Sequence, residues 1–160
     1  MLIFGCRHPE QDFLYADELK GYAEKGITDL HVAFSRADTP KSYVQDLVAA
    51  QKDKVWKLIE AGAIIYVCGD GGKMEPDVKR ALMSIYREKT GADEAAAAAW
   101  IDGMGTQNRY VLDVWAGSGD WSWPGHSFSK NGVASARLCS ATTSICPSAS
   151  TRRAHGPRCR

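Results

Sequence analysis

The stretch that decides the fold is residues 63–72, AIIYVCGDGG. Its first half is rich in β-branched and aromatic residues, which favour a buried strand. The run breaks off at Cys68 and continues into a glycine-rich turn that precedes a helical pattern. Ligands of open α/β proteins bind beyond the carboxyl ends of such strands. The stretch therefore predicts a ligand site beside Cys68.

Strands and helices alternate on both sides of this stretch. Further short apolar strands are expected at residues 2–6, 30–34 and 109–115. Helical spacing of apolar residues fills the intervals, at residues 12–26, 43–61, 74–86 and 93–104. Strands that alternate with helices imply a parallel sheet with right-handed crossovers. We therefore expect an α/β fold with an open, doubly wound parallel sheet.

The character of the chain changes after residue 117. Residues 1–117 hold 14 Lys and Arg against 18 Asp and Glu, whereas residues 118–160 hold six against one. The later stretch is rich in Ser, Arg, Gly and Thr and has no periodicity, so we expect a disordered basic tail that looks like an out-of-frame extension. The 160 residues thus provide one domain, residues 1–117, and this tail.

Composition narrows the classes of function. The acidic body offers no electrostatic support for nucleic-acid binding. No apolar run approaches the roughly 18–20 residues of a membrane helix, and the first residues lack the basic leader of a signal peptide. Five cysteines without regular spacing argue against a disulfide framework and favour a reducing, cytoplasmic location. The histidines and cysteines show no metal-ligand spacing, so no metal site is expected.

The loop after the second strand carries a candidate phosphate site. Ser35 and Arg36 end the strand, and Lys41 and Tyr43 follow shortly after. A guanidinium fork and an ammonium suit a phosphate, and arginine at this place in a dinucleotide fold accommodates the 2′-phosphate of NADP. The alternative is a solvated loop that happens to hold two cations.

Cys68 itself has two interpretations. The glycines after it permit close approach of a ligand to the backbone, and a glycine-rich turn before a helix favours anions. The turn matches neither the dinucleotide fingerprint nor the Walker loop, because Lys73 has no earlier glycine at the required spacing. The alternative is a small buried apolar residue. Covalent catalysis is not favoured, because no histidine lies near Cys68 in sequence.

The last strand ends in Asp113, Val114 and Trp115. Residues two apart in a strand point to the same face, so Asp113 and Trp115 are expected to share a site. The alternative is a tryptophan that packs on the core.

Seven motifs recur in the order and spacing of one known family. They are GCR (residues 5–7), DFLYADEL (12–19), VAFSR (32–36), KSYVQ (41–45), YVCGD (66–70), MEPDV (74–78) and RYVLDVW (109–115). Together, over residues 1–117, they resemble the carboxy-terminal NADPH-binding domain of diflavin reductases, a Rossmann-like module. The ending DVWAG is similar to that of bacterial monooxygenases that carry their own reductase.

The resemblance implies a role for each matched residue. The 2′-phosphate site of NADP(H) would comprise Ser35, Arg36, Lys41 and Tyr43, with Gln45 nearby. Cys68 and Asp113 would orient the nicotinamide for hydride transfer, and Trp115 would stack on FAD. Asp77 would contact NADP, and Arg7 would lie near its phosphates. Electrons would then pass through FMN to a haem protein, and the flavin and nicotinamide would supply the chemistry.

The chain also departs from that family. The first strand, glycine-rich turn and helix of the module are missing, so we expect a gap at the centre of the sheet with two exposed inner edges. The FAD, FMN and haem domains are missing too, so we expect the isolated chain to be inactive. The alternatives are a non-enzymatic remnant with weak or no NADP binding, and a relative of the sulfite or nitric-oxide type of flavoprotein reductase.

Overall fold

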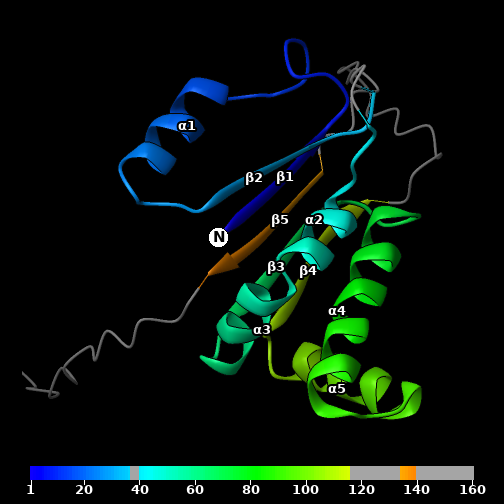
Figure 1. Ribbon diagram of the computed structural model, residues 1–160. Coiled ribbons are helices and arrows are strands. Elements are labelled where there is room, and N and C mark those ends of the chain that lie inside the picture. The colour runs from blue at the N-terminus through cyan, green and yellow to red at the C-terminus, as the bar shows by residue number, and fades with distance from the viewer. Residues whose placement is uncertain (37–39, 116–133, 140–160) are drawn as a thin grey trace, which may run out of the picture.

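The computed structural model describes residues 1–36, 40–115 and 134–139, the last of these as backbone only (Figure 1). The strands are β1 (Leu2–Cys6), β2 (Leu30–Phe34), β3 (Ile64–Asp70), β4 (Tyr110–Trp115) and β5 (Ala134–Cys139). The helices are α1 (Ala16–Glu24), α2 (Val44–Ala50), α3 (Lys52–Glu60), α4 (Met74–Thr90) and α5 (Glu94–Thr106). The alternation of strands and helices expected from the sequence is confirmed through β4.

The strands form one sheet in the order β2-β1-β5-β3-β4. β1 pairs with β2 in parallel, and β3 pairs with β4 in parallel, as expected. β5 lies between β1 and β3 and runs antiparallel to both, so the described sheet is mixed. The strand fills the place where we expected a gap.

β5 also departs from the expected disorder of residues 118–160, because its six residues form a paired strand. The rest of that stretch, residues 116–133 and 140–160, lies outside the described residues. The domain boundary at residue 117 falls there as well and stays a prediction.

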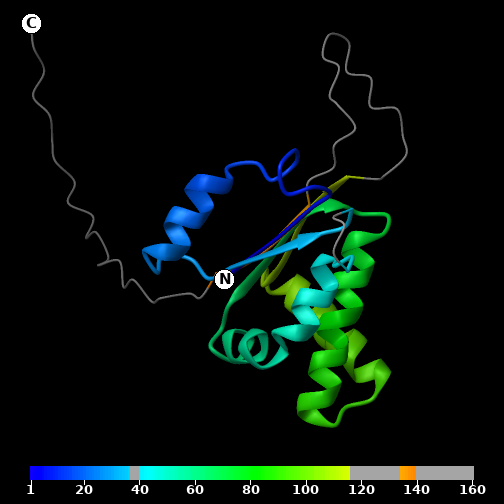
Figure 2. The same ribbon diagram turned by 45° about the horizontal axis from the view of Figure 1, so that its top comes forward.

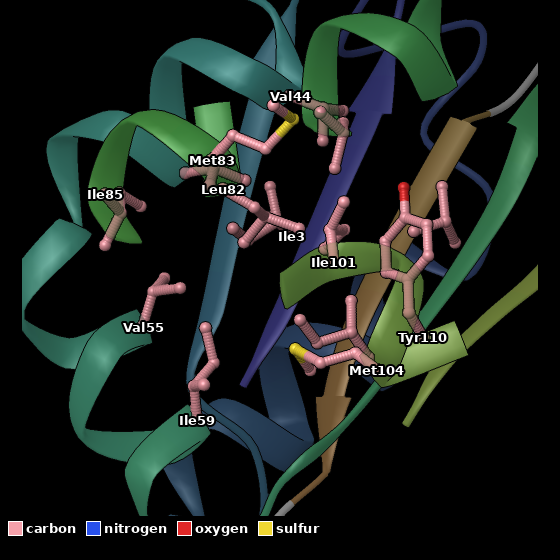
Figure 3. Close-up of a cluster of buried hydrophobic side chains, with 14 of the residues drawn as sticks. Ile3, Val44, Val55, Ile59, Leu82, Met83, Ile85, Ile101, Met104 and Tyr110 are labelled. Carbon is pink, nitrogen blue, oxygen red and sulfur yellow. The ribbon is translucent and has the colours of Figure 1, made fainter. Parts of the chain in front are cut away.

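Helices cover both faces of the sheet. α2 to α5 lie on one face and α1 on the other, next to β1 and β2 (Figures 1 and 2). The main core forms under α2 to α5, where Ile3, Ile65 and Val67 of the sheet belong to one cluster with Leu82 of α4 and Ile101 of α5. Figure 3 shows Ile3, Leu82 and Ile101 in this cluster. Each of these five side chains is at most 1% exposed. Burying a side chain of this size contributes about 1.5–3 kcal/mol.

The face that carries α1 is only partly covered. No residue of α1 is buried, and Phe13, just before the helix, packs on Phe4 of β1 with ring centroids 5.3 Å apart. Over β3 and β4 the same face stays open, because Tyr66 is 43% exposed and Trp115 is 41% exposed.

Arg109 fixes where β3 and β4 begin. Its guanidinium donates to the carbonyl oxygen of Ile59 at 2.7 Å and to that of Ala63 at 3.3 Å. The carbonyl of Arg109 in turn accepts from the N–H of Ile65 at 2.8 Å. This clamp starts the register that sets Cys68 opposite Asp113.

Among the described helices, none is long and apolar enough to cross a membrane.

Candidate functional site

A cleft of about 480 Å³ opens at the carboxyl ends of β1, β2 and β3. Five residues that the sequence singled out line it: Arg7, Ser35, Tyr43, Gln45 and Asp77. They come from segments up to 70 positions apart, and the parallel sheet brings them to one edge.

Backbone hydrogen bonds hold the first side of the cleft. The N–H groups of Ser35 and Arg36 donate to the carbonyls of Cys6 and Arg7 at 2.9 and 3.0 Å, which continues the β1–β2 pairing past the strands. After the loop, the N–H of Ser42 donates to the carbonyl of Phe34 at 3.2 Å and returns the chain to the sheet.

Asp46 then starts α2, because its carboxylate accepts from the N–H of Tyr43 at 2.8 Å. Tyr43 is therefore held at the mouth of the cleft.

Gln45 and Asp77 join α2 to α4 across the cleft. The amide nitrogen Nε2 of Gln45 donates to Oδ2 of Asp77 at 3.4 Å, and the same carboxylate pairs with Arg80. Asp77 is thus already engaged by two donors.

Arg36 and Lys41 are not among the residues that line the cleft. Both are exposed, and they flank residues 37–39, which lie outside the described residues. Their expected place beside Ser35 and Tyr43 in the 2′-phosphate site stays a prediction.

Lys73, Ser42 and Met74 also line the cleft, and sequence reasoning did not assign them to a site. The sequence predicts that the turn before α4 favours anions, but not that Lys73 adds its charge there. Lys73 lies directly before α4, and a helix amino terminus and a cation both favour an anion.

A second group of candidate residues lies on β3 and β4, beside the cleft. Cys68 and Asp113 are register partners, and the Cys68 thiol donates to Oδ2 of Asp113 at 3.9 Å. Burial, and next the charge of Asp113, raise the pKa of the Cys68 thiol. A neutral thiol is a poor nucleophile. The expectation against covalent catalysis stays a prediction.

Trp115 ends β4 opposite Asp70, two residues from Asp113 and on the same face. Trp115 is 41% exposed. The carbonyl of Trp115 accepts from the N–H of Gly71 at 2.8 Å. A Cβ at Gly71 would lie 3.2 Å from that oxygen, so glycine allows this close approach.

Comparison with known proteins identifies a family for the first half of the chain. Residues 1–80 match the oxidoreductase NAD-binding domain family. The chain is 45% identical over 117 residues to a bifunctional cytochrome P450/NADPH–P450 reductase of Bacillus cereus. It is 44% identical over 116 residues to an NADPH–cytochrome P450 reductase of Dictyostelium discoideum, and 43% identical over 117 residues to one of Homo sapiens.

Each of these alignments covers 72% of the chain. It covers 11% of the bacterial protein and 17% of the other two, so the chain spans a small part of the length of these relatives.

Proposed function

Because this chain belongs to the oxidoreductase NAD-binding domain family, we propose that it is the NADPH-binding part of a flavoprotein reductase that supplies electrons to a haem protein. The observation that supports this most is the convergence of Arg7, Ser35, Tyr43, Gln45 and Asp77 on one cleft. The relatives reported above carry P450 reductase names, which favours this interpretation over a remnant or a sulfite or nitric-oxide type of reductase.

The donor set of the cleft fits NADP(H). The cleft presents the cations of Arg7 and Lys73 and the hydroxyls of Ser35, Ser42 and Tyr43, which suit phosphates. The carboxylates of Asp70 and Asp77 also line it, and Asp77 is paired with Arg80. In this proposal Ser35 and Tyr43, joined by the exposed Arg36 and Lys41, hold the 2′-phosphate. Arg7 and Lys73 hold the remaining phosphates, and Gln45 and Asp77 contact the cofactor between α2 and α4.

Cys68 and Asp113 orient the nicotinamide in this proposal. The bound cofactor supplies the hydride, and the protein supplies position and charge. The thiol of Cys68 donates to the carboxylate of Asp113, so the two groups lie together on one face of β3 and β4. That carboxylate favours positive charge on a ring lying beside it. Both groups act by orientation, without a covalent bond to substrate.

Trp115 is the proposed contact for FAD. Its exposed ring ends β4 on the face that carries Cys68 and Asp113, and a flat aromatic surface suits an isoalloxazine ring. An FAD domain would therefore meet the open face over β3 and β4, with FMN and haem domains further along the electron path. We propose that turnover belongs to this whole assembly, and that NADPH is its electron donor.

A cytoplasmic location completes the proposal. The two cysteines whose side chains the structure describes, Cys6 and Cys68, are both free thiols, which suits a reducing compartment.

Binding to the full chain tests the proposal. Titration calorimetry compares NADP⁺ with NAD⁺, which lacks the 2′-phosphate. In this proposal Arg36 and Lys41 each make one charge-assisted contact with the 2′-phosphate, worth about 1.5–3 kcal/mol before solvent reduces it. Together they predict a preference for NADP⁺ over NAD⁺ of about 100-fold. Arg36→Ala and Lys41→Ala should each lower this preference about 10-fold, whereas Lys57→Ala, an exposed cation of α3, should leave it unchanged. Equal affinity of the unaltered chain for the two nucleotides would refute the proposal.

A further inference from the structure

A buried hydroxyl reaches the first turn of α4 from the core of the protein. Tyr110, the first residue of β4, belongs to the core cluster and is 8% exposed. Figure 3 shows its ring among the core side chains, with the hydroxyl oxygen pointing away from Met104. That hydroxyl donates to Oε1 of Glu75 at 2.9 Å. A buried tyrosine hydroxyl needs such a partner, and here the partner is a carboxylate.

Glu75 lies between residues of the cleft in sequence but not in space. Lys73, Met74 and Asp77 line the cleft, and Glu75 does not. The geometry of the helix accounts for this, because Glu75 lies about 100° round the axis from Met74. Its half-buried side chain meets Tyr110 on the side of α4 that faces the core. The start of α4 therefore presents a cation to the cleft and this carboxylate to the core.

The first turn of α4 holds two carboxylates, Glu75 and Asp77. Acidic residues at this place stabilise a helix through its macrodipole, but the same charges repel a phosphate in the adjoining cleft. Both carboxylates are held by donors. Asp77 accepts from Gln45 and pairs with Arg80. Glu75 accepts from Tyr110.

The direction of the Glu75 carboxylate decides whether Lys73 is free for a ligand. Lys73 precedes Glu75 by two residues, lines the cleft and, among the described residues, forms no ion pair. A glutamate side chain populates several rotamers, so a carboxylate without a partner turns toward a nearby cation. An ion pair between Glu75 and Lys73 would occupy the ammonium group and place a negative charge at the cleft. The hydrogen bond from Tyr110 opposes that rearrangement.

The Tyr110 hydroxyl is held as a donor. Burial, and next the charge of Glu75, raise the pKa of this hydroxyl. It therefore stays protonated at neutral pH, and its one proton points to the carboxylate. The change Tyr110→Phe keeps the ring in the core and removes only this donor, so it separates the hydrogen bond from the packing.

We propose that Tyr110 is a positioning residue of the cofactor site, which holds the Glu75 carboxylate against the core and so leaves Lys73 free for the phosphates of NADP(H). This inference rests on the proposed function, in which Lys73 binds phosphate. Tyr110 does not touch the cofactor and acts through Glu75. Without the hydroxyl the carboxylate competes for Lys73, and without the carboxylate the hydroxyl has no effect on binding.

The first experiment measures NADP⁺ binding to the full chain by calorimetry. Tyr110→Phe should weaken binding about 5-fold at low salt and less at high salt, because the released charge acts through the solvent. The matched control is Tyr86→Phe. Tyr86 lies about three turns further along α4, outside the cleft, with its ring stacked on Trp100. Removal of its hydroxyl should leave the affinity unchanged.

The second experiment removes the charge that Tyr110 holds. Glu75→Gln keeps an oxygen that accepts from the hydroxyl, and this variant should bind NADP⁺ at least as tightly as the unaltered chain. Addition of Tyr110→Phe to Glu75→Gln should change the affinity by less than about 2-fold. If Tyr110 served only to pack the core, its change to phenylalanine would weaken binding equally in both backgrounds.

A third variant leaves the core intact and covers the case in which Tyr110→Phe does not fold. Glu75→Asp keeps the charge on a side chain one methylene shorter, which cannot reach the hydroxyl. It should weaken NADP⁺ binding about 3-fold at low salt. Circular dichroism confirms that each variant is folded.

The outcomes separate this inference from the function on which it rests. If the unaltered chain shows no preference for NADP⁺ over NAD⁺, the proposed function and this inference both fail. If that preference is present, three results overturn the inference alone. They are unchanged affinity of folded Tyr110→Phe, an equal loss in the Glu75→Gln background, and unchanged affinity of Glu75→Asp.

Discussion

Arg109 holds together the amino-terminal ends of β3 and β4, and its removal should destabilise the whole sheet. The guanidinium donates to the carbonyls of Ile59 and Ala63, and the residues that carry these carbonyls are 5% and 0% exposed. A buried acceptor left without a donor costs about 1–3 kcal/mol. Arg109 is itself half-buried, so water replaces part of the loss. We expect Arg109→Ala to lower the free energy of unfolding by about 2–3 kcal/mol.

Urea unfolding followed by far-ultraviolet circular dichroism measures this loss. Arg109→Lys keeps one charged donor and should lose about half as much, because it lacks the planar fork that reaches two carbonyls. The matched control is Arg87→Ala, which breaks the exposed pair with Glu94 and should change stability by less than about 1 kcal/mol. If Arg109→Ala is no more destabilising than Arg87→Ala, the clamp is not what fixes the start of β3 and β4.

Three further predictions concern the site and its surroundings. Lys73→Ala should weaken NADP⁺ binding to the full chain about 10-fold at low salt and less at high salt. The control is Lys79→Ala, because Lys79 pairs with Asp102 outside the cleft, and this change should leave the affinity measured by calorimetry unchanged. Asp113→Asn should speed the alkylation of Cys68 at pH 8, because Asp113 contributes to the raised pKa of that thiol. Peptide mapping after treatment with iodoacetamide measures the alkylation rate. An unchanged rate would contradict the pairing of Cys68 with Asp113. Burial and the nearby Glu75 raise the pKa of the Tyr110 hydroxyl above its usual value of about 10. The folded protein therefore holds this proton more tightly than the unfolded chain. The resulting contribution to the free energy of unfolding is complete below about pH 10 and falls as the pH rises further. Urea titrations at pH 9 and pH 11 should show a larger loss for the unaltered chain than for Tyr110→Phe.

The local pattern of the sequence was sufficient for the fold through β4. Apolar runs such as residues 63–67 and the helical spacing around Leu82 carry their own signal, since each depends on neighbours in the chain. Parallel topology then predicts that Ser35 and Cys68 lie at one edge of the sheet, which is where they are.

β5 could not be predicted in this way. The six residues ASARLC alternate apolar and polar residues only briefly and contain no continuous apolar run. The strand therefore depends on edges offered by β1 and β3, which lie more than 60 positions earlier in the chain. Lys73 carries a local signal, its position directly before α4, but the residues that line the cleft with it depend on α2 and α4 meeting in space. The role of Arg109 likewise depends on carbonyls about 50 positions away.

The central position of β5 also sets a temporal order during synthesis. A ribosome makes the middle strand of this sheet last, 24 residues after β4 is complete. At about 5–20 residues per second, roughly 1–5 s separate the end of β4 from the end of β5. During that interval the nascent chain carries two unpaired strand edges beside an apolar core. Chaperones that bind extended apolar segments therefore have a defined window, and codons that slow translation between β4 and β5 should lower the yield of native protein.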